Sequence, residues 1–123
     1  MTQKPVAIVT GGAGFIGSHM VDLLVDQGYK VRVIDNLVGG REANLEHHSN
    51  ENNVEAEWRD IRSLDPGDAL FSDVNYVFHF AGIGDIVPSI EQPVEYMSTN
   101  VQGTVKVLEA ARAAGTIKKF VYA

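Results

Sequence analysis

The segment VAIVTGGAGFIGSH, residues 6–19, constrains the fold more than any other part of the chain. Its first five residues form a continuous apolar and mostly β-branched run, which is typical of a parallel strand covered on both faces. Gly11, Gly14 and Gly17 follow, and an apolar pattern of helical period then runs to Gly28, a residue suited to a left-handed helix end. The segment therefore predicts a strand, a tight glycine turn and a helix in direct succession.

Four further strand patterns alternate with helical patterns along the chain. The third, VEAEW, places Val54, Ala56 and Trp58 on one face and glutamates on the other, which favours a strand at a sheet edge with Trp58 on its buried face. Alternating strands and helices imply parallel pairing through right-handed crossovers. We therefore expect an α/β fold, a Rossmann-like doubly wound parallel sheet of strand order 3-2-1-4-5. The five expected strands are residues 6–10, 30–35, 54–58, 74–80 and 118–123.

Three other helices are expected. A short one lies near residues 41–48, and another covers residues 64–71 with Asp65 as its N-cap. The longest begins after Pro93 and ends at Gly115. Its larger apolar residues step by 3, 4, 4 and 3 and form one stripe: Val94, Met97, Val101, Val105 and Leu108.

Length and composition define the class of protein. A chain of 123 residues forms one domain, residues 1–123, large enough for a continuous core. The formal net charge of −6 and the scattered basic residues argue against nucleic acid or an anionic membrane as a partner. The chain has no cysteine and its N-terminal apolar run is too short and glycine-rich for a signal peptide or membrane span, so a cytoplasmic location is expected.

The glycine turn predicts a dinucleotide site. Gly12, Gly14 and Gly17 also satisfy G-x-G-x-x-G, and Asp35 ends the second strand eighteen residues after Gly17. Such a turn lets the helix N-terminus hold a diphosphate, while the acid accepts hydrogen bonds from the adenosine ribose and repels a 2′-phosphate. NAD is therefore expected rather than NADP. An ATP-type phosphate loop is excluded because Gly17 is followed by Ser18, with no lysine.

Other polar positions allow two interpretations. Asp60 could bind an adenine amino group or merely cap a turn. HFAG, residues 79–82, could pass close to a ribose or simply pack. Asn100 lies inside the long helix, where asparagine is a poor helix former and requires a reason. His47 and His48 have no cysteine or carboxylate at ligand spacing, so we expect a solvated surface and no metal site.

Six motifs occur in an order that is similar to one known family. They are VTGGAGFIGSH, VIDN, RDI, VFHFAG, NVQGTVKVLEAAR and KKFVYA. Together they resemble the N-terminal part of the extended short-chain dehydrogenase/reductases, and within these the NAD-dependent nucleotide-sugar epimerases and dehydratases, above all the UDP-glucose (UDP-galactose) 4-epimerases. One position departs from the pattern: Gly84 stands where such epimerases often have a lysine.

The resemblance implies a role for each part of an NAD site. The backbone of Phe15 and Ile16 contacts the diphosphate, residues 35–40 surround the adenosine ribose, Asp60 and Ile61 hold the adenine, and the end of the fourth strand lines the nicotinamide. The implied cofactor-binding residues are Gly11, Gly14, Phe15, Ile16, Gly17, Asp35, Asn36, Leu37, Gly39, Gly40, Asp60, Ile61, Phe80, Ala81, Gly82 and Asn100.

The resemblance also implies an activity. Such enzymes oxidise a sugar hydroxyl to a ketone and return the hydride, using a Y-x-x-x-K helix that this sequence lacks. We therefore expect no catalytic residue here, and expect residues 1–123 to be the front of a longer enzyme, truncated after the fifth strand. The whole enzyme would act on a nucleotide sugar, most simply a UDP-sugar, and form a homodimer through the helix after Pro93 together with the missing Y-x-x-x-K helix. The alternatives are a 4,6-dehydratase, a UDP-glucuronate decarboxylase, or a non-catalytic dinucleotide sensor.

Overall fold

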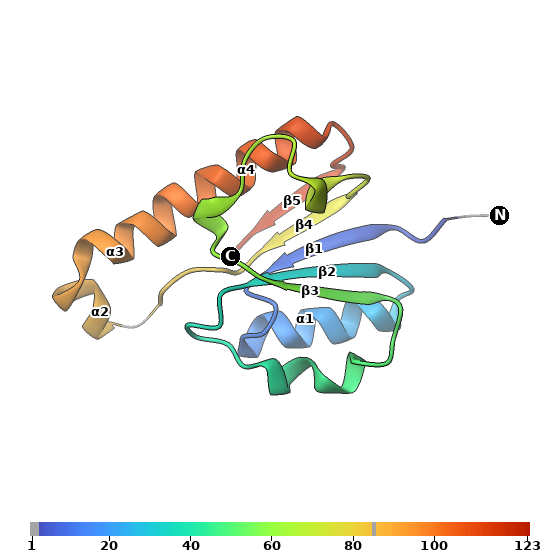
Figure 1. Cartoon of the computed structure of the whole chain (residues 1–123), viewed down its shortest axis with the longest axis horizontal. Coiled ribbons are helices and arrows are strands. Elements are labelled where there is room, and N and C mark those ends of the chain that lie inside the picture. The colour runs from blue at the N-terminus through green and yellow to red at the C-terminus, as the bar shows by residue number, and fades with distance from the viewer. Residues whose placement is uncertain (1–2, 85) are drawn as a thin grey trace.

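A computed structural model describes residues 3–84 and 86–123. It contains a five-stranded sheet of order β3-β2-β1-β4-β5, and all four neighbouring pairs are parallel (Figure 1). The predicted fold class and strand order are thus confirmed. The strands are β1 (Val6–Thr10), β2 (Lys30–Asp35), β3 (Val54–Trp58), β4 (Tyr76–His79) and β5 (Lys119–Tyr122).

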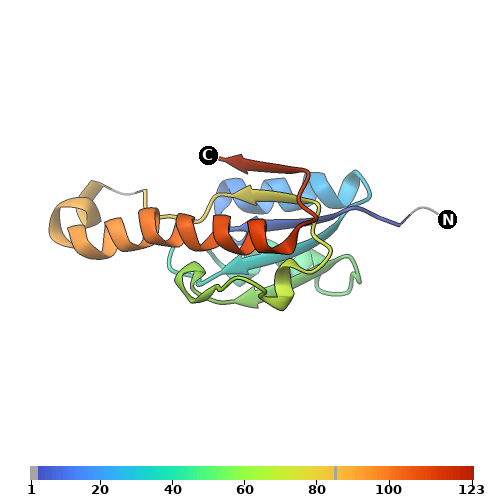
Figure 2. The ribbon, with the colours of Figure 1, turned by 90° about the horizontal axis from the view of Figure 1, so that it is seen from above.

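Helices cover both faces of the sheet. On one face lie α1 (Phe15–Asp26) and the 3₁₀ helix η1 (Glu42–His48), which is the short helix expected near residues 41–48 (Figure 1). The other face carries α4 (Gly103–Ala114) with two short 3₁₀ turns, η2 (Ile61–Ser63) and η3 (Ala69–Phe71). Before α4 the chain forms α2 (Ile86–Glu91), α3 (Pro93–Met97) and a π-helical segment, η4 (Ser98–Gln102), which extend beyond the sheet (Figure 2).

The core consists of two apolar layers separated by the sheet. Ile8 of β1 joins the layer under α4, while Ala7 and Val9 join the layer under α1, and all three are 0% exposed. Alternate side chains of a central strand point to opposite faces, so a strand buried on both faces needs an uninterrupted apolar run. This explains why the sequence of β1 does not alternate.

Two glycines end helices as predicted. Gly28, with φ of 89°, follows the last turn of α1, and its amide donates to the carbonyl of Val25. Gly115, with φ of 70°, is the left-handed cap of α4. Glycine adopts this conformation without the steric cost that a Cβ imposes.

The prediction for residues 64–71 was wrong in extent. Only Ala69–Phe71 is helical, and its N-cap is Asp68, which accepts a hydrogen bond from the amide of Leu70, rather than Asp65. The reason is Gly67, whose φ of 85° places it in a turn closed by the bond from the Asp68 amide to the Asp65 carbonyl. A residue in this conformation cannot continue a right-handed helix.

The fourth strand is shorter than the expected 74–80, because regular pairing covers Tyr76–His79. The third strand lies at the edge, as predicted, but its expected buried face is wrong. Ala56 is exposed and Trp58 is 41% exposed, because the described helices leave these two side chains of the edge strand uncovered.

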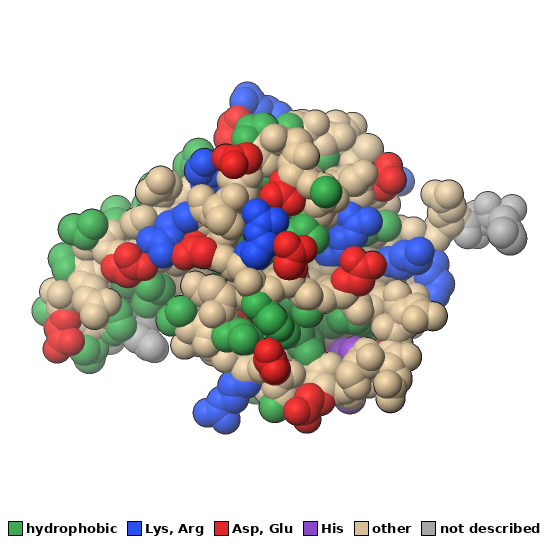
Figure 3. All heavy atoms as spheres, viewed as in Figure 1, with side chains coloured by type: hydrophobic (Ala, Val, Ile, Leu, Met, Phe, Trp, Pro, Cys, Tyr) green, Lys and Arg blue, Asp and Glu red, His purple; other side chains and the backbone are tan. Residues whose placement is uncertain are grey.

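The apolar stripe of the long helix does not face the core. Its five residues are exposed to between 44% (Leu108) and 82% (Val94). The buried face of α4 consists of Gly103, Val107, Ala110 and Ala111. Val107 and the two alanines join the apolar layer over the sheet, whereas Gly103 packs on Ile61 of η2. Figure 3 shows hydrophobic side chains gathered over α2 and α3, at the end of the molecule where this stripe begins.

The remaining surface is mixed in charge. Figure 3 shows Lys and Arg side chains interspersed with Asp and Glu over the face formed by β3, η2 and η3. None of the described helices combines the length and the apolar composition that a membrane span requires.

Candidate dinucleotide-binding site

Two glycines of the turn after β1 are required by close backbone packing. A Cβ on Gly11, whose φ is 70°, would lie 2.8 Å from the amide nitrogen of Ala81 after β4. A Cβ on Gly17 would lie 2.8 Å from the carbonyl carbon of Gly11 and closer still to its oxygen. These contacts hold the start of α1 against the ends of β1 and β4, which is the packing role that the spacing predicts.

The N-terminus of α1 is open. Its N-cap is Gly14, and among the described residues no side chain caps it and its first turn carries no acid. The amide of Ser18 makes the bond to the Gly14 carbonyl at 2.9 Å, so the preceding amides have no intrahelical acceptor. Phe15 and Ile16 are 77% and 66% exposed. Amides without an intrahelical acceptor at the positive end of a helix dipole bind anions such as a diphosphate.

Asp35 holds the glycine turn as well as ending β2. It is 7% exposed; its Oδ2 accepts from the amide of Ala13 at 2.9 Å and its Oδ1 accepts from the amide of Leu37 at 2.7 Å. Each carboxylate oxygen can accept two hydrogen bonds, so capacity for ribose hydroxyls remains. Sequence reasoning missed the two backbone bonds, which involve a positive φ of 66° at Leu37.

The loop after β2 folds onto the glycine turn. The amide of Arg41 and the side-chain amide of Asn44 both donate to the carbonyl of Ala13, at 3.0 Å and 2.7 Å. A Cβ on Gly40 would lie 2.9 Å from both Ala13 and the Asp35 carboxylate, whereas one on Gly39 would meet no atom within 4 Å. Asn36 is exposed at the start of this loop. The expected ribose loop therefore lies directly beside Asp35.

The end of β4 is pinned to the end of β1 by Thr10. Its hydroxyl oxygen accepts from the amides of Phe80 and Ala81, both at 3.1 Å, and lies 2.6 Å from Nδ1 of His79. Thr10 is fully buried. This residue was not among the predicted site residues, because a threonine ending an apolar strand has no distinctive pattern.

His79 extends the same chain of hydrogen bonds into α4. The Thr104 hydroxyl donates to the Asn100 carbonyl at 2.6 Å, so it accepts from Nε2–H of His79 at 2.8 Å. Nδ1 is then unprotonated and accepts from the Thr10 hydroxyl. Burial, at 1% exposure, lowers the pKa of His79 to about 4, so the imidazole is neutral near pH 7.

Asn100 has a structural reason to lie within a helix. Its Oδ1 accepts from the amide of Ile83 at 2.7 Å and its Nδ2 donates to the carbonyl of Ile83 at 2.9 Å. A Cβ on Gly82 would lie 2.9 Å from that Oδ1. Asn100 thus orders the loop after β4, and it does so from a π-helical segment, a distortion that frequently marks functional sites.

Asp60 caps η2, the simpler of its two predicted interpretations. Its Oδ1 accepts from the amide of Arg62 at 2.9 Å, and its Oδ2 pairs with the Arg62 guanidinium at 2.6 Å. The hydrogen bond from this guanidinium lowers the pKa of Asp60. Ile61 is 4% exposed and packs under Gly103, so its side chain belongs to the core and only its backbone is left for adenine.

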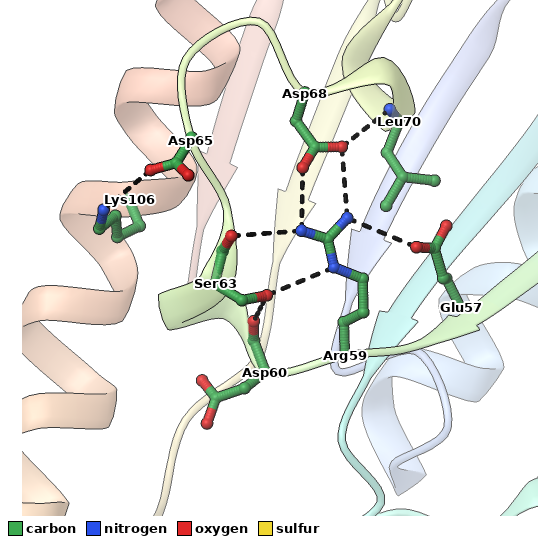
Figure 4. Close-up of polar contacts among 8 residues, drawn as sticks. All are labelled: Glu57, Arg59, Asp60, Ser63, Asp65, Asp68, Leu70 and Lys106. Atoms are coloured by element: carbon green, nitrogen blue, oxygen red, sulfur yellow. Dashed lines mark hydrogen bonds and ion pairs between the residues drawn. The ribbon is translucent and has the colours of Figure 1, made fainter.

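Arg59 fixes the segment that presents Asp60 (Figure 4). Its guanidinium donates to Asp68 at 2.9 Å and to the carbonyl of Ser63 at 3.2 Å, while its amide donates to the carbonyl of Asp35 at 2.9 Å. The hydrogen bond to Asp68 raises the pKa of Arg59. Hydrogen bonds and an ion pair therefore hold the connection between β3 and η3 beside the end of β2.

The predicted site residues gather at the end of the sheet where the strands finish. Parallel strands place their carboxyl ends together, and the strand order reverses between β1 and β4. The glycine turn, Asp35, the loop after it and residues 80–82 are joined there by direct contacts. Asp60 follows β3, the strand next to β2, and Asn100 reaches the same end of the sheet from η4.

Comparison with known proteins agrees with this geometry. The model of the NAD dependent epimerase/dehydratase family matches residues 7–123 of the chain. The chain belongs to this family. The parallel sheet, the open N-terminus of α1 and the acid that ends β2 therefore occur in a chain of a family described as NAD dependent.

Three relatives illustrate the range of the family. A putative UDP-glucose 4-epimerase of Methanocaldococcus jannaschii is 41% identical over 119 residues, which are 94% of this chain and 36% of that protein. UDP-glucuronic acid decarboxylase 4 of Arabidopsis thaliana is 39% identical over 108 residues, 88% of this chain and 23% of that protein.

The solved structure of UDP-N-acetylglucosamine 4-epimerase from Methanobrevibacter ruminantium, in complex with UDP-N-acetylmuramic acid, has a TM-score of 0.86 and 35% identity. The matched region covers 97% of this chain and 37% of the epimerase chain. The chain therefore spans less than two fifths of the length of each of these three relatives.

Proposed function

We propose that residues 1–123 form the NAD-binding portion of a nucleotide-sugar epimerase of the 4-epimerase type. The observation that carries the proposal is the open N-terminus of α1 beside the Asp35 carboxylate, in a chain of the NAD-dependent epimerase/dehydratase family. The amides of Phe15 and Ile16 bind the diphosphate, and Asp35 accepts from the adenosine ribose.

The other predicted residues complete the site. Asn36, Leu37, Gly39 and Gly40 border the ribose, and Asp60 with the backbone of Ile61 binds the adenine. The segment Phe80–Gly82, ordered by Asn100, borders the nicotinamide ribose. Since the Asp60 carboxylate already pairs with Arg62, it binds adenine through its remaining acceptor capacity.

Bound NAD supplies a hydride acceptor for oxidation of a sugar hydroxyl. The residues of this chain contribute binding and orientation, and they hold the cofactor at the strand ends where Thr10 and His79 fix the backbone. In the whole protein the substrate is a UDP-sugar, by analogy with the three relatives. The exposed stripe of the long helix, which includes Val101 and Val105, forms a homodimer interface. We place the protein in the cytoplasm.

A UDP-glucuronate decarboxylase is the second candidate, because the Arabidopsis thaliana relative is 39% identical to the chain. Incubating the whole protein separately with UDP-glucose and UDP-glucuronate, with product analysis by NMR, distinguishes the two. UDP-galactose from the first substrate supports the epimerase, whereas carbon dioxide and a UDP-pentose from the second support the decarboxylase. NAD binding with neither reaction would contradict both and favour a dinucleotide sensor.

A further inference from the structure

Two imidazoles and one carboxylate converge between α1 and η1, which lie side by side on one face of the sheet (Figure 1). Nε2 of His47 and Nε2 of His48 each lie 2.6 Å from the same Oδ1 of Asp22. The three ligand atoms lie within 4.8 Å of one another. Asp22 lies about two turns along α1 from the amides proposed to bind the diphosphate, so this cluster is separate from the dinucleotide site.

The cluster has an ordered side and an open side. His48 is 7% exposed and pairs with Asp22 of α1, so the expectation of a solvated surface is wrong for this residue. Its second nitrogen, Nδ1, lies 3.4 Å from Oε1 of Glu51. The side chains of Asp22 and His47 are 47% and 55% exposed. A histidine that binds a metal usually directs its other nitrogen to a carboxylate, which fixes the ring. Glu51 stands in that relation to His48, while the open side leaves room for water.

We propose that Asp22, His47 and His48 bind a divalent transition-metal ion, preferentially Zn²⁺, with water as the fourth ligand. Two histidines and one carboxylate are a donor set that zinc accepts, at bond lengths of about 2.0–2.2 Å. Tetrahedral bonds of that length set ligand atoms about 3.3 Å apart. The two 2.6 Å nitrogen–oxygen separations open to this value by a shift of less than about 1 Å of the exposed Asp22 carboxylate. The two imidazole nitrogens, which lie within 4.8 Å of each other, would take up the same spacing.

The ion would stabilise the loop and helix η1 that lie against the glycine turn of the proposed cofactor site. η1 follows the loop whose Arg41 amide donates to the carbonyl of Ala13, and Asn44 of η1 donates to the same carbonyl. A metal joining His47 and His48 to α1 restrains this connection at its other end. Because an ion that binds the folded state stabilises it by mass action, zinc raises the melting temperature.

The test is zinc titration of the purified protein, free of any polyhistidine tag and stripped with a chelator, followed by calorimetry. The expected result is one Zn²⁺ per chain and a melting temperature that rises by several degrees at saturating zinc. Asp22→Asn and His47→Gln change exposed side chains, and each lowers the zinc affinity at least roughly 10-fold, as loss of a ligand should. Asp26→Asn, an exposed aspartate one turn further along α1, is the matched control and keeps the wild-type affinity.

Binding of Co²⁺ gives a second readout, because tetrahedral cobalt absorbs far more strongly in the visible than the hydrated ion. The wild-type protein should show this band and Asp22→Asn should lose it. Unchanged zinc affinity in both variants, or a cobalt spectrum identical to that of the free ion, would overturn the proposal. The cluster would then be a hydrogen-bonded pair of histidines around one carboxylate and nothing more.

Discussion

Gly17→Ala tests the packing that places the helix N-terminus. In the structure an added Cβ would lie 2.8 Å from the carbonyl carbon of Gly11 and 2.9 Å from Cα of Gly12, and nearer still to the carbonyl oxygen. Non-bonded carbon atoms prefer about 3.5–4.0 Å. All three neighbours are backbone atoms, so α1 must move away from the turn by roughly 1 Å.

The cost of this movement can be estimated. Overpacking costs about 1–3 kcal/mol, and backbone neighbours that cannot rotate away place Gly17 at the upper end. Alanine recovers up to about 1 kcal/mol through its higher helix propensity. The net loss of unfolding free energy is about 2 kcal/mol, which lowers the melting temperature by about 8 °C for a domain of this size.

The assay combines thermal unfolding with NAD titration by calorimetry. Displaced amides should also weaken NAD binding by at least roughly 10-fold, since the diphosphate contacts depend on their position. Gly84→Ala is the matched control for the melting temperature, because an added Cβ there meets no atom within 4 Å. A Gly17→Ala protein with the wild-type melting temperature and NAD affinity would refute the packing argument.

Three other predictions concern binding, pH and assembly. Asp35→Ala should weaken NAD binding by roughly 10–100-fold and reduce the preference over NADP, since it removes ribose contacts and charge; an unchanged preference in paired titrations would remove Asp35 from this role. Because the pKa of His79 is lowered to about 4, the unfolded state binds its proton first as the pH falls from about 6.5, so the unfolding free energy should drop by up to about 3 kcal/mol by pH 4. Urea unfolding across this range should show less of that slope in His79→Asn, and equal slopes would contradict the assignment. Val105→Asp, in the exposed stripe, should convert the whole protein from dimer to monomer in sedimentation velocity, whereas a persistent dimer would exclude this interface.

The parts of the fold fixed by neighbouring residues were predictable. The continuous run of β1, the glycine turn and the left-handed ends at Gly28 and Gly115 each depend on a few adjacent positions. The strand order followed from the alternation of strands and helices, together with the charged face of β3. Asp35 was located for the same reason, since its distance from the glycine turn is itself a pattern.

Contacts across long sequence separations were not predictable. Asp22 and His48 are 26 residues apart, and nothing near either residue indicates the other. The hydrogen bonds of Thr10 with residues after β4 span about 70 positions for the same reason. The buried face of the long helix was not predictable from its apolar stripe, because that face is made of Gly103, Val107 and two alanines, while the five residues of the stripe lie outside.

A crystal structure of the protein with NAD would locate the dinucleotide relative to α1 and Asp35. We expect diphosphate oxygens within hydrogen-bond distance of the amide nitrogens of Phe15 and Ile16, with the adenosine ribose hydroxyls on the Asp35 carboxylate. A dinucleotide bound elsewhere, or none at saturating concentration, would contradict this expectation.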